Sequence, residues 1–226
     1  MSDFAPPTPG WVYYTVTRAV GLLGYTLCPM RIFGAERIPW DGPAVLLPNH
    51  ESYLDPLFLA CATWRPIRFM AKRELFRGFG SWLFPRLNCF QVSRGQADVP
   101  AFRNASRTLS AGKLLCVFPE GTRSEDGNLQ RAQAGAVSIA LRAEVPLLPV
   151  AISGTWSVLP PHGKLRLRPV AIEIGTPMVF PRLNRKARAD RGVADRVGAC
   201  IMEEIARLRR QLEAEFGSRS GTPDRR

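Results

Sequence analysis

The chain has 226 residues, 46% of them hydrophobic, and carries 31 basic and 19 acidic side chains. This length and apolar content allow a buried core, which excludes a disordered or low-complexity protein. The net charge of +12 is concentrated in residues 65–113, where 10 basic and 2 acidic residues give a net +8. Such a concentration indicates an anionic partner. The five cysteines form no close pair and the two histidines stand apart, which favours free thiols and argues against a zinc site.

The first expected element is an apolar and aromatic helix over residues 11–30, with Arg18 as its single charge. Three prolines shortly before it argue against a secretory signal. Its length approaches the ~20 residues of a membrane-spanning helix. However, a central arginine costs roughly 2.5 kcal/mol or more in a bilayer. We therefore expect a helix that lies in or against a membrane interface. The alternative is a core helix of a soluble domain.

Strands and helices are expected to alternate along the rest of the chain. Runs rich in β-branched and apolar residues predict strands at 44–48, 67–71, 89–93, 114–119, 147–152 and 170–174. Helical patterns are expected near 56–64, 99–111 and 133–143, and an amphipathic helix over 191–216. This alternation predicts an α/β domain with a mixed, largely parallel sheet flanked by helices.

We divide the chain into three parts on these grounds. We expect residues 1–34 to form an N-terminal membrane-associating helical segment, residues 35–216 to form the α/β domain, and residues 217–226 to form a disordered tail.

Polar residues follow two of the predicted strands directly, where chemistry collects in α/β sheets. The first cluster is NHESYLD, which contains His50 and Asp55. Pro56 disfavours helical geometry at Asp55, so the loop is expected to turn the carboxylate toward the imidazole. A carboxylate on one ring nitrogen leaves the other free to accept a proton, as a general base does. The alternative for Asp55 is a helix cap in front of a proline.

The sequence shows no nucleophilic side chain that this base could activate. The sequence has no GxSxG pattern and no cysteine with a plausible partner, and His162 lies in a predicted turn. A base without a protein nucleophile implies that the substrate supplies the attacking group, as a hydroxyl does in direct acyl transfer.

The second cluster is FPEGTRS, residues 118–124. Gly121 permits close backbone approach, and the three residues after it offer hydrogen-bond donors. Such a loop suits an oxyanion, phosphate above all. The alternative is a surface turn with a solvated arginine.

Together these segments resemble the sequence blocks of the glycerolipid acyltransferases. NHESYLD is similar to their NHxxxxD block, FPEGTRS to their phosphate-binding block, and VPLLPVAISGT (145–155) to their fourth block. CFQVSR matches the second block at Arg94, and FMAKREL resembles a segment that supplies a lysine, here Lys72. The second block normally has a glycine where Asn88 stands and an apolar residue where Gln91 stands. The subgroup that the chain resembles most is 1-acylglycerol-3-phosphate acyltransferase.

The resemblance implies an α/β domain with an N-terminal helical pair on the membrane, and a role for each site residue. His50 would deprotonate the sn-2 hydroxyl of a lysophosphatidic acid while Asp55 orients the imidazole. The hydroxyl would attack an acyl thioester and phosphatidic acid would leave. Lys72, Arg94 and Arg123 would hold the acceptor phosphate.

The same resemblance implies that Glu120 and Gly121 shape the phosphate loop and that Thr122 binds substrate with them. No metal or cofactor is implied, and the acyl donor would be acyl-coenzyme A or acyl-acyl carrier protein. The protein would lie on the cytoplasmic face of the cell membrane, monotopic or peripheral, with its oligomeric state left open.

Residues 73–87, RELFRGFGSWLFPRL, mix aromatic and basic side chains in a way that suits the headgroup region of an anionic bilayer. Aromatic residues among basic ones can also bind single-stranded nucleic acid, but no nucleic-acid module frames them here, so no nucleic-acid partner is expected. Two further alternatives stay open: the same chemistry on another lysolipid or an amino-lipid, and a non-catalytic protein that binds anionic lipid.

Overall fold

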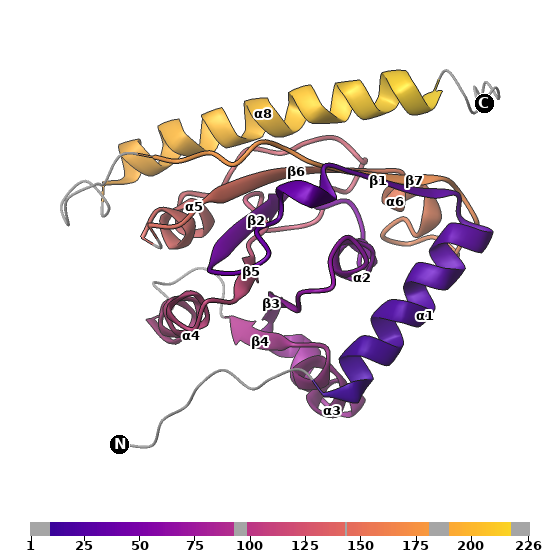
Figure 1. Cartoon of the computed structure of the whole chain (residues 1–226), viewed down its shortest axis with the longest axis horizontal. Coiled ribbons are helices and arrows are strands. Elements are labelled where there is room, and N and C mark those ends of the chain that lie inside the picture. The colour runs from indigo at the N-terminus through magenta and orange to yellow at the C-terminus, as the bar shows by residue number, and fades with distance from the viewer. Residues whose placement is uncertain (1–9, 93–98, 143, 181–189, 218–226) are drawn as a thin grey trace.

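The computed structural model describes residues 10–92, 99–142, 144–180 and 190–217 (Figure 1). In these residues seven strands form one sheet, in the order β1-β7-β6-β2-β5-β3-β4. Their bounds are β1 Met30–Phe33, β2 Ala44–Pro48, β3 Ile67–Lys72, β4 Cys89–Val92, β5 Leu114–Cys116, β6 Leu147–Ser153 and β7 Val170–Ile174. Neighbouring strands are parallel except β6 and β7. The prediction of an α/β fold with a mixed, largely parallel sheet is confirmed.

Helices cover both faces of this sheet (Figure 1). They are α1 Trp11–Leu27, α2 Asp55–Ala60, α3 Phe79–Arg86, α4 Val99–Ser110, α5 Ala134–Leu141, α6 Thr155–Val158 and α8 Arg191–Gly217, with 3-10 turns η1 Ala35–Arg37 and η2 Arg73–Phe76. In β2, Ala44 and Leu46 face the core beneath α1 and α2, whereas Val45 and Leu47 face the core beneath α4, α5 and α8. A parallel strand buried on both faces has no polar side, which explains the unbroken apolar run.

Helix α1 packs against the domain through one face and exposes the other. Its buried residues are Val12, Tyr13, Thr17, Gly21 and Gly24. The Tyr13 hydroxyl accepts the backbone N–H of Ile67 at 3.1 Å, and burial raises the pKa of Tyr13 to about 12. The helix ends at Leu27, earlier than expected, because the chain enters β1 at Met30. Residues 10–29 thus contain one helix, where the family resemblance implies a pair.

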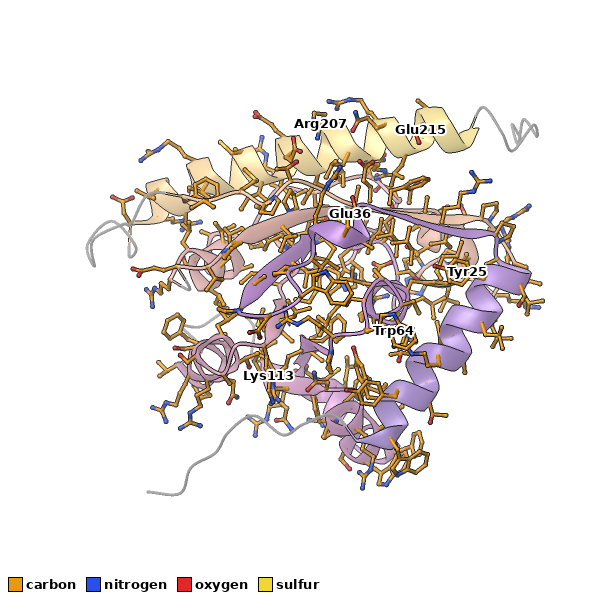
Figure 2. The ribbon with its side chains drawn as sticks, in the orientation of Figure 1. Tyr25, Glu36, Trp64, Lys113, Arg207 and Glu215 are labelled. Atoms are coloured by element: carbon orange, nitrogen blue, oxygen red, sulfur yellow. The ribbon has the colours of Figure 1, made fainter. Side chains whose placement is uncertain are left out.

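The outward face of α1 is apolar. Its exposed large side chains are Trp11, Tyr14, Leu22, Leu23, Tyr25 and Leu27. Figure 2 shows Tyr25 near the end of this helix and Trp64 beside it, where the Arg18 guanidinium lies 3.4 Å from the centroid of a Trp64 ring. No helix in the described ranges is long and apolar enough to cross a membrane.

Two basic residues of the strongly charged stretch serve the fold and not an outside partner. Arg65 donates to the carbonyls of Pro39, Gly42 and Gly112, at 2.7 Å for Gly42 and 2.8 Å for Gly112. Arg68 is buried within β3, near the ring of Phe90. These two side chains therefore add nothing to a surface for the expected anionic partner. Arg65 instead joins loops at the amino ends of the strands.

Replacement of Arg65 should destabilise the fold. Arg65→Met leaves three carbonyls without their donor, and hydrogen bonds to a charged group are worth about 1.5–3 kcal/mol each at most. We expect the free energy of unfolding, measured by urea denaturation, to fall by about 2 kcal/mol. The exposed Arg77 supplies the matched control, and Arg77→Met should stay within about 0.5 kcal/mol of the parent. Equal stability of both variants would contradict the structural role of Arg65.

Candidate active site

The residues expected to carry chemistry lie at the ends of strands along one edge of the sheet. Strands β2, β3, β5 and β6 run parallel, so their carboxyl ends lie on the same side. His50 follows the end of β2, Lys72 is the last residue of β3, and residues 118–124 follow β5. Such an edge is where ligands bind in open α/β sheets. Arg94 lies outside the described residues.

His50 and Asp55 are in direct contact. The Nδ1 atom of His50 lies 2.7 Å from Oδ2 of Asp55, and the same oxygen accepts the backbone N–H groups of Glu51 at 2.7 Å and Ser52 at 2.8 Å. A carboxylate only accepts hydrogen bonds, so Nδ1 carries the hydrogen and Nε2 keeps the lone pair. The expected contact is present, but the expectation of a non-helical Asp55 before Pro56 is wrong, because Asp55 is the first residue of helix α2.

The helix-cap alternative for Asp55 is wrong. Helix α2 begins at Asp55, its N-cap is Leu54, and no side chain caps it. The carboxylate instead accepts N–H groups from residues that precede it, and it is fully buried. Its second oxygen, Oδ1, is buried without a hydrogen-bond partner in the described part of the chain.

The imidazole of His50 is held from a second side by Phe118. The two rings stack at 3.8 Å between centroids with an interplanar angle of 24°. The His50 side chain is 14% exposed, so the ring is fixed yet open to a reactant. An imidazole that cannot rotate away keeps its lone pair in one place, which is what a general base needs.

Glu120 joins the His50 loop to the loop after β5. Its Oε1 accepts the N–H of His50 and its Oε2 accepts the N–H of Gln130, both at 2.9 Å. Burial raises the pKa of Glu120 to about 7, against the two N–H groups that lower it. The N–H of Ser124 donates to the His50 carbonyl at 2.8 Å. Glu120 is thus occupied within the fold and is 1% exposed.

The backbone of the second loop turns sharply at Gly121, which has φ of +68°. A Cβ added there would lie 3.0 Å from Cγ of Gln133. A side chain would therefore disfavour this turn both through the positive φ and through this close contact. The turn carries Thr122 and Arg123, both half-buried. The Arg123 guanidinium lies 3.4 Å from the centroid of the Tyr53 ring, which belongs to the His50 loop.

Arg123 is available for an anion in this arrangement. In the part of the chain that the structure describes, no acidic side chain pairs with it. Stacking on Tyr53 fixes the plane of the guanidinium while its N–H groups stay free to donate. Lys72 is exposed at the end of β3, on the same edge of the sheet. Sequence reasoning missed Tyr53, although an aromatic residue between His50 and Asp55 was visible.

Glu51 is a second residue that sequence reasoning missed. It is 2% exposed. Its oxygens lie 3.3 Å from the side-chain nitrogens of Asn49 and Arg209 and 3.4 Å from the Thr155 hydroxyl and the Trp156 N–H. Burial raises the pKa of Glu51 to about 8, while Arg209 acts to lower it.

Asn49 holds the start of this loop to the neighbouring strand. Its Nδ2 donates to the carbonyl of Ile152 at 2.9 Å, and its Oδ1 accepts the N–H of Ile152 at 2.7 Å. The amide therefore continues the β2–β6 pairing beyond Pro48.

The departure at Asn88 from the family's second block has a backbone explanation. Asn88 follows α3 with φ of +62°, the left-handed conformation that a glycine adopts freely and that asparagine tolerates best among other residues. Its side chain donates to the carbonyl of Ile67 at 2.8 Å. Gln91 lies exposed on β4.

Two other features lie apart from these residues. In the described ranges no three His, Cys, Asp or Glu side chains are grouped to hold a metal ion. A cavity of about 380 Å³ opens at the opposite edge of the sheet, near the amino ends of β2, β5 and β6. Its lining includes Pro43, Phe102, Gly112 and Arg142, and none of the predicted site residues.

Three acyltransferases are similar to this chain, two of them in sequence and one in its solved structure. A 1-acyl-sn-glycerol-3-phosphate acyltransferase of Chlamydomonas reinhardtii is 30% identical over 155 residues, which cover 66% of this chain and 46% of that protein. One of Bacillus subtilis is 33% identical over 144 residues, which cover 61% of this chain and 70% of that protein. The crystal structure of the 1-acyl-sn-glycerophosphate acyltransferase of Thermotoga maritima matches with a TM-score of 0.66 and 27% identity, over 85% of this chain and 77% of that one.

The chain spans about half the length of the algal relative. A family model described as Acyltransferase matches residues 29–153, which is more than half of the chain and includes β1 to β6 with both polar loops. The resemblance inferred from the sequence blocks is confirmed: the chain belongs to the acyltransferase family.

Proposed function

We propose that the protein transfers a fatty acyl group from a thioester donor to the sn-2 hydroxyl of 1-acylglycerol-3-phosphate, giving phosphatidic acid. The observation that carries the proposal is the 2.7 Å contact between His50 Nδ1 and a buried Asp55. It leaves Nε2 to take a proton. The names of the relatives point to the same acceptor.

In the proposed reaction His50 is the general base and no acyl-enzyme forms. The acceptor oxygen attacks the thioester carbonyl carbon as Nε2 removes its proton, and the C–S bond breaks in the collapse of the tetrahedral intermediate. The proton then passes from the imidazolium to the departing thiolate. A base of this kind contributes ~10²–10⁴ in rate. The buried Asp55 holds the tautomer and stabilises the imidazolium as it forms.

Arg123 and Lys72 are proposed to bind the acceptor phosphate, with Arg94 and Thr122 as further contacts. Both cations leave the same edge of the sheet as His50, and Arg123 reaches over the His50 loop onto Tyr53. A planar guanidinium donates two parallel hydrogen bonds to phosphate. Phosphate bound here would position the glycerol hydroxyl against the base. The donor is acyl-coenzyme A or acyl-acyl carrier protein.

We place the protein on the cytoplasmic face of the membrane, with an anionic lipid surface as its partner. The outward face of α1 offers apolar side chains without an acidic residue, and α3 with the turn before it exposes Phe79, Trp82 and the arginines of the 73–87 segment. Aromatic and basic side chains together suit the interface of an anionic bilayer.

A loop on the catalytic edge offers a third contact. Leu165 and Leu167 are 66% and 59% exposed and alternate with Lys164, Arg166 and Arg168. Residues 145–172 contain no acidic residue, and these three bases form no ion pair with the described part of the chain.

One hydrogen bond joins the start of this segment to the His50 loop, and another joins its end to the chain just after α1. The Ser52 hydroxyl donates to the carbonyl of Leu159 at 3.0 Å, and the N–H of Val170 donates to the carbonyl of Pro29 at 3.4 Å. The segment between them therefore lies from the His50 loop to the end of α1, so a bilayer that contacts α1 would also reach the loop.

The first test concerns the base and the acceptor. Purified protein is given acyl-coenzyme A or acyl-acyl carrier protein with a panel of lysolipids, and products are read by mass spectrometry. We expect phosphatidic acid from lysophosphatidic acid, and a loss of turnover of ~10²–10⁴ in His50→Ala with acceptor affinity within a few-fold. The exposed His162 supplies the control, and His162→Ala should keep its turnover.

Other outcomes separate the rival functions. Preference for a different lysolipid would change the acceptor and keep the chemistry. Lipid binding without transfer to any acceptor would favour a non-catalytic lipid-binding protein. Turnover of His50→Ala close to the parent would rule out the base.

The second test concerns Arg123. Arg123→Ala should raise KM for lysophosphatidic acid and lower kcat, because headgroup contacts also position the hydroxyl. Arg123→Lys should recover part of the loss, since an ammonium does not reproduce the two-pronged contact. The variant should also lose its preference for lysophosphatidic acid over monoacylglycerol. Arg131→Ala, in the same loop, is the control. An equal fall with both acceptors would mean that Arg123 only shapes the loop.

The third test concerns the membrane surface. Replacing Lys164, Arg166 and Arg168 by glutamate should reduce flotation with phosphatidylglycerol vesicles and leave the weak binding to phosphatidylcholine vesicles unchanged. Glutamate at the exposed Arg103, Arg107 and Arg196, which changes the charge equally elsewhere, should have a smaller effect. For the parent, salt should weaken binding without abolishing it, because apolar burial is not screened. Complete release by salt would show that no apolar side chain inserts.

A further inference from the structure

Helix α8 lies beyond the part of the chain that the family model matches, residues 29–153, yet it reaches the active site. In Figure 1 it is the long helix that runs across one face of the sheet. Its buried side chains are Ala194, Ile201, Ile205, Leu208 and Leu212. This apolar face sets the position of the helix, and one polar side chain next to it, Arg209, turns toward the catalytic edge.

Arg209 contacts two loops at once. Its NH1 donates to the carbonyl of Gly127 at 2.9 Å, and its NH2 lies 3.3 Å from Oε1 of Glu51. Its Nε donates to Glu213 on the same helix at 2.8 Å, which fixes the direction of the side chain. The Arg209 side chain is 19% exposed, so these contacts lie largely beneath the surface.

The Glu51 contact leads to the base. Glu51 is the neighbour of His50, and its backbone N–H donates to the oxygen of Asp55 that contacts the imidazole. Arg209 is the basic side chain in contact with the Glu51 carboxylate among the described residues. Loss of Arg209 leaves a buried polar group without one of its partners, which destabilises its surroundings more than loss of both members of the contact.

The Gly127 contact leads to the proposed phosphate loop. Gly127 lies between Arg123 and Gln130, and a Cβ added to it would lie 3.3 Å from the Trp156 ring. The N–H of Trp156 in turn donates to Glu51 at 3.4 Å, and its indole donates to the carbonyl of Glu125 at 3.3 Å. The loops after β2, β5 and β6 thus meet at one partly buried polar cluster, to which α8 contributes Arg209.

We propose that Arg209 is a positioning residue for acyl transfer, fixing the His50 loop relative to the Arg123 loop. The inference rests on the proposed function for its kinetic readout. One acceptor molecule must place its phosphate at one loop and its hydroxyl at the other, so their separation has to match the molecule. A displacement of about 1 Å between such groups can lower the rate by ~10².

The first part of the test compares two arginines of the same helix. Arg209→Met should lower kcat with lysophosphatidic acid by at least ~10-fold, and amides of residues 49–55 and 120–130 should exchange hydrogen faster. Arg207 is the matched control: it pairs with Glu204 at 2.6 Å on the outer side of α8 and is labelled in Figure 2. Arg207→Met should keep both kcat and the exchange of the two loops.

The second part tests the route through Glu51. Arg209→Met combined with Glu51→Gln changes both members of the contact, so the double variant should lose less kcat than the product of the two single losses. Arg209→Lys, which keeps a cation near Glu51, should fall between the parent and Arg209→Met. If Arg209→Met does not fold, the losses of kcat are compared in Arg209→Lys, Glu51→Gln and their combination.

The outcomes separate this inference from the proposed function. Parent-like kcat and hydrogen exchange of the loops in folded Arg209→Met would overturn the positioning role. An equal loss of kcat in Arg207→Met would overturn it as well. So would a double variant whose loss of kcat equals the product of the two single losses. If the parent transfers acyl groups to no acceptor, the proposed function fails. Faster exchange of both loops in Arg209→Met, with Arg207→Met unchanged, would still support the positioning contact.

Discussion

One oxygen of Asp55 organises the edge of the sheet that carries the candidate active site. It accepts hydrogens from the imidazole of His50 and from the backbone of Glu51 and Ser52, and Asp55 itself is not exposed to solvent. The conformation of the His50 loop and the orientation of the imidazole therefore depend on the same carboxylate. The energetic demand of a buried carboxylate explains why so many N–H donors converge on it.

The second loop depends on the first through backbone contacts. Glu120 accepts the His50 N–H, and Ser124 donates to the His50 carbonyl, so the residue that carries the base is also the point where both loops join. Arg123 then stacks on Tyr53 from the opposite loop. The proposed base and the proposed anion site thus share the same few peptide groups, and the sharp turn at Gly121 would leave room for an anion to approach the backbone.

The local features of this arrangement could be predicted from the sequence, and the long-range ones could not. Strands β2 to β7 follow from the apolar runs. The His50–Asp55 contact was expected and is present, although the reason given for it was wrong, because Asp55 is the first residue of helix α2 despite the proline after it. Strand β1 was missed because its four residues continue an apolar stretch that resembles a helix. Arg209 and Glu51 meet only because α8 crosses the sheet, which no local pattern reveals. The positive charge of residues 65–113 did not predict the role of Arg65 in the fold. Composition does not distinguish an arginine in solvent from one that donates to backbone carbonyls.

The central claim is that His50 acts directly on the acceptor hydroxyl without an acyl-enzyme. The measurement that tests it most directly is the intact mass of the protein after incubation with excess long-chain acyl-coenzyme A and no acceptor. The account predicts an unmodified mass, because no side chain beside His50 is placed as a nucleophile in the described structure. A covalent acyl adduct that disappears when lysophosphatidic acid is added would contradict it.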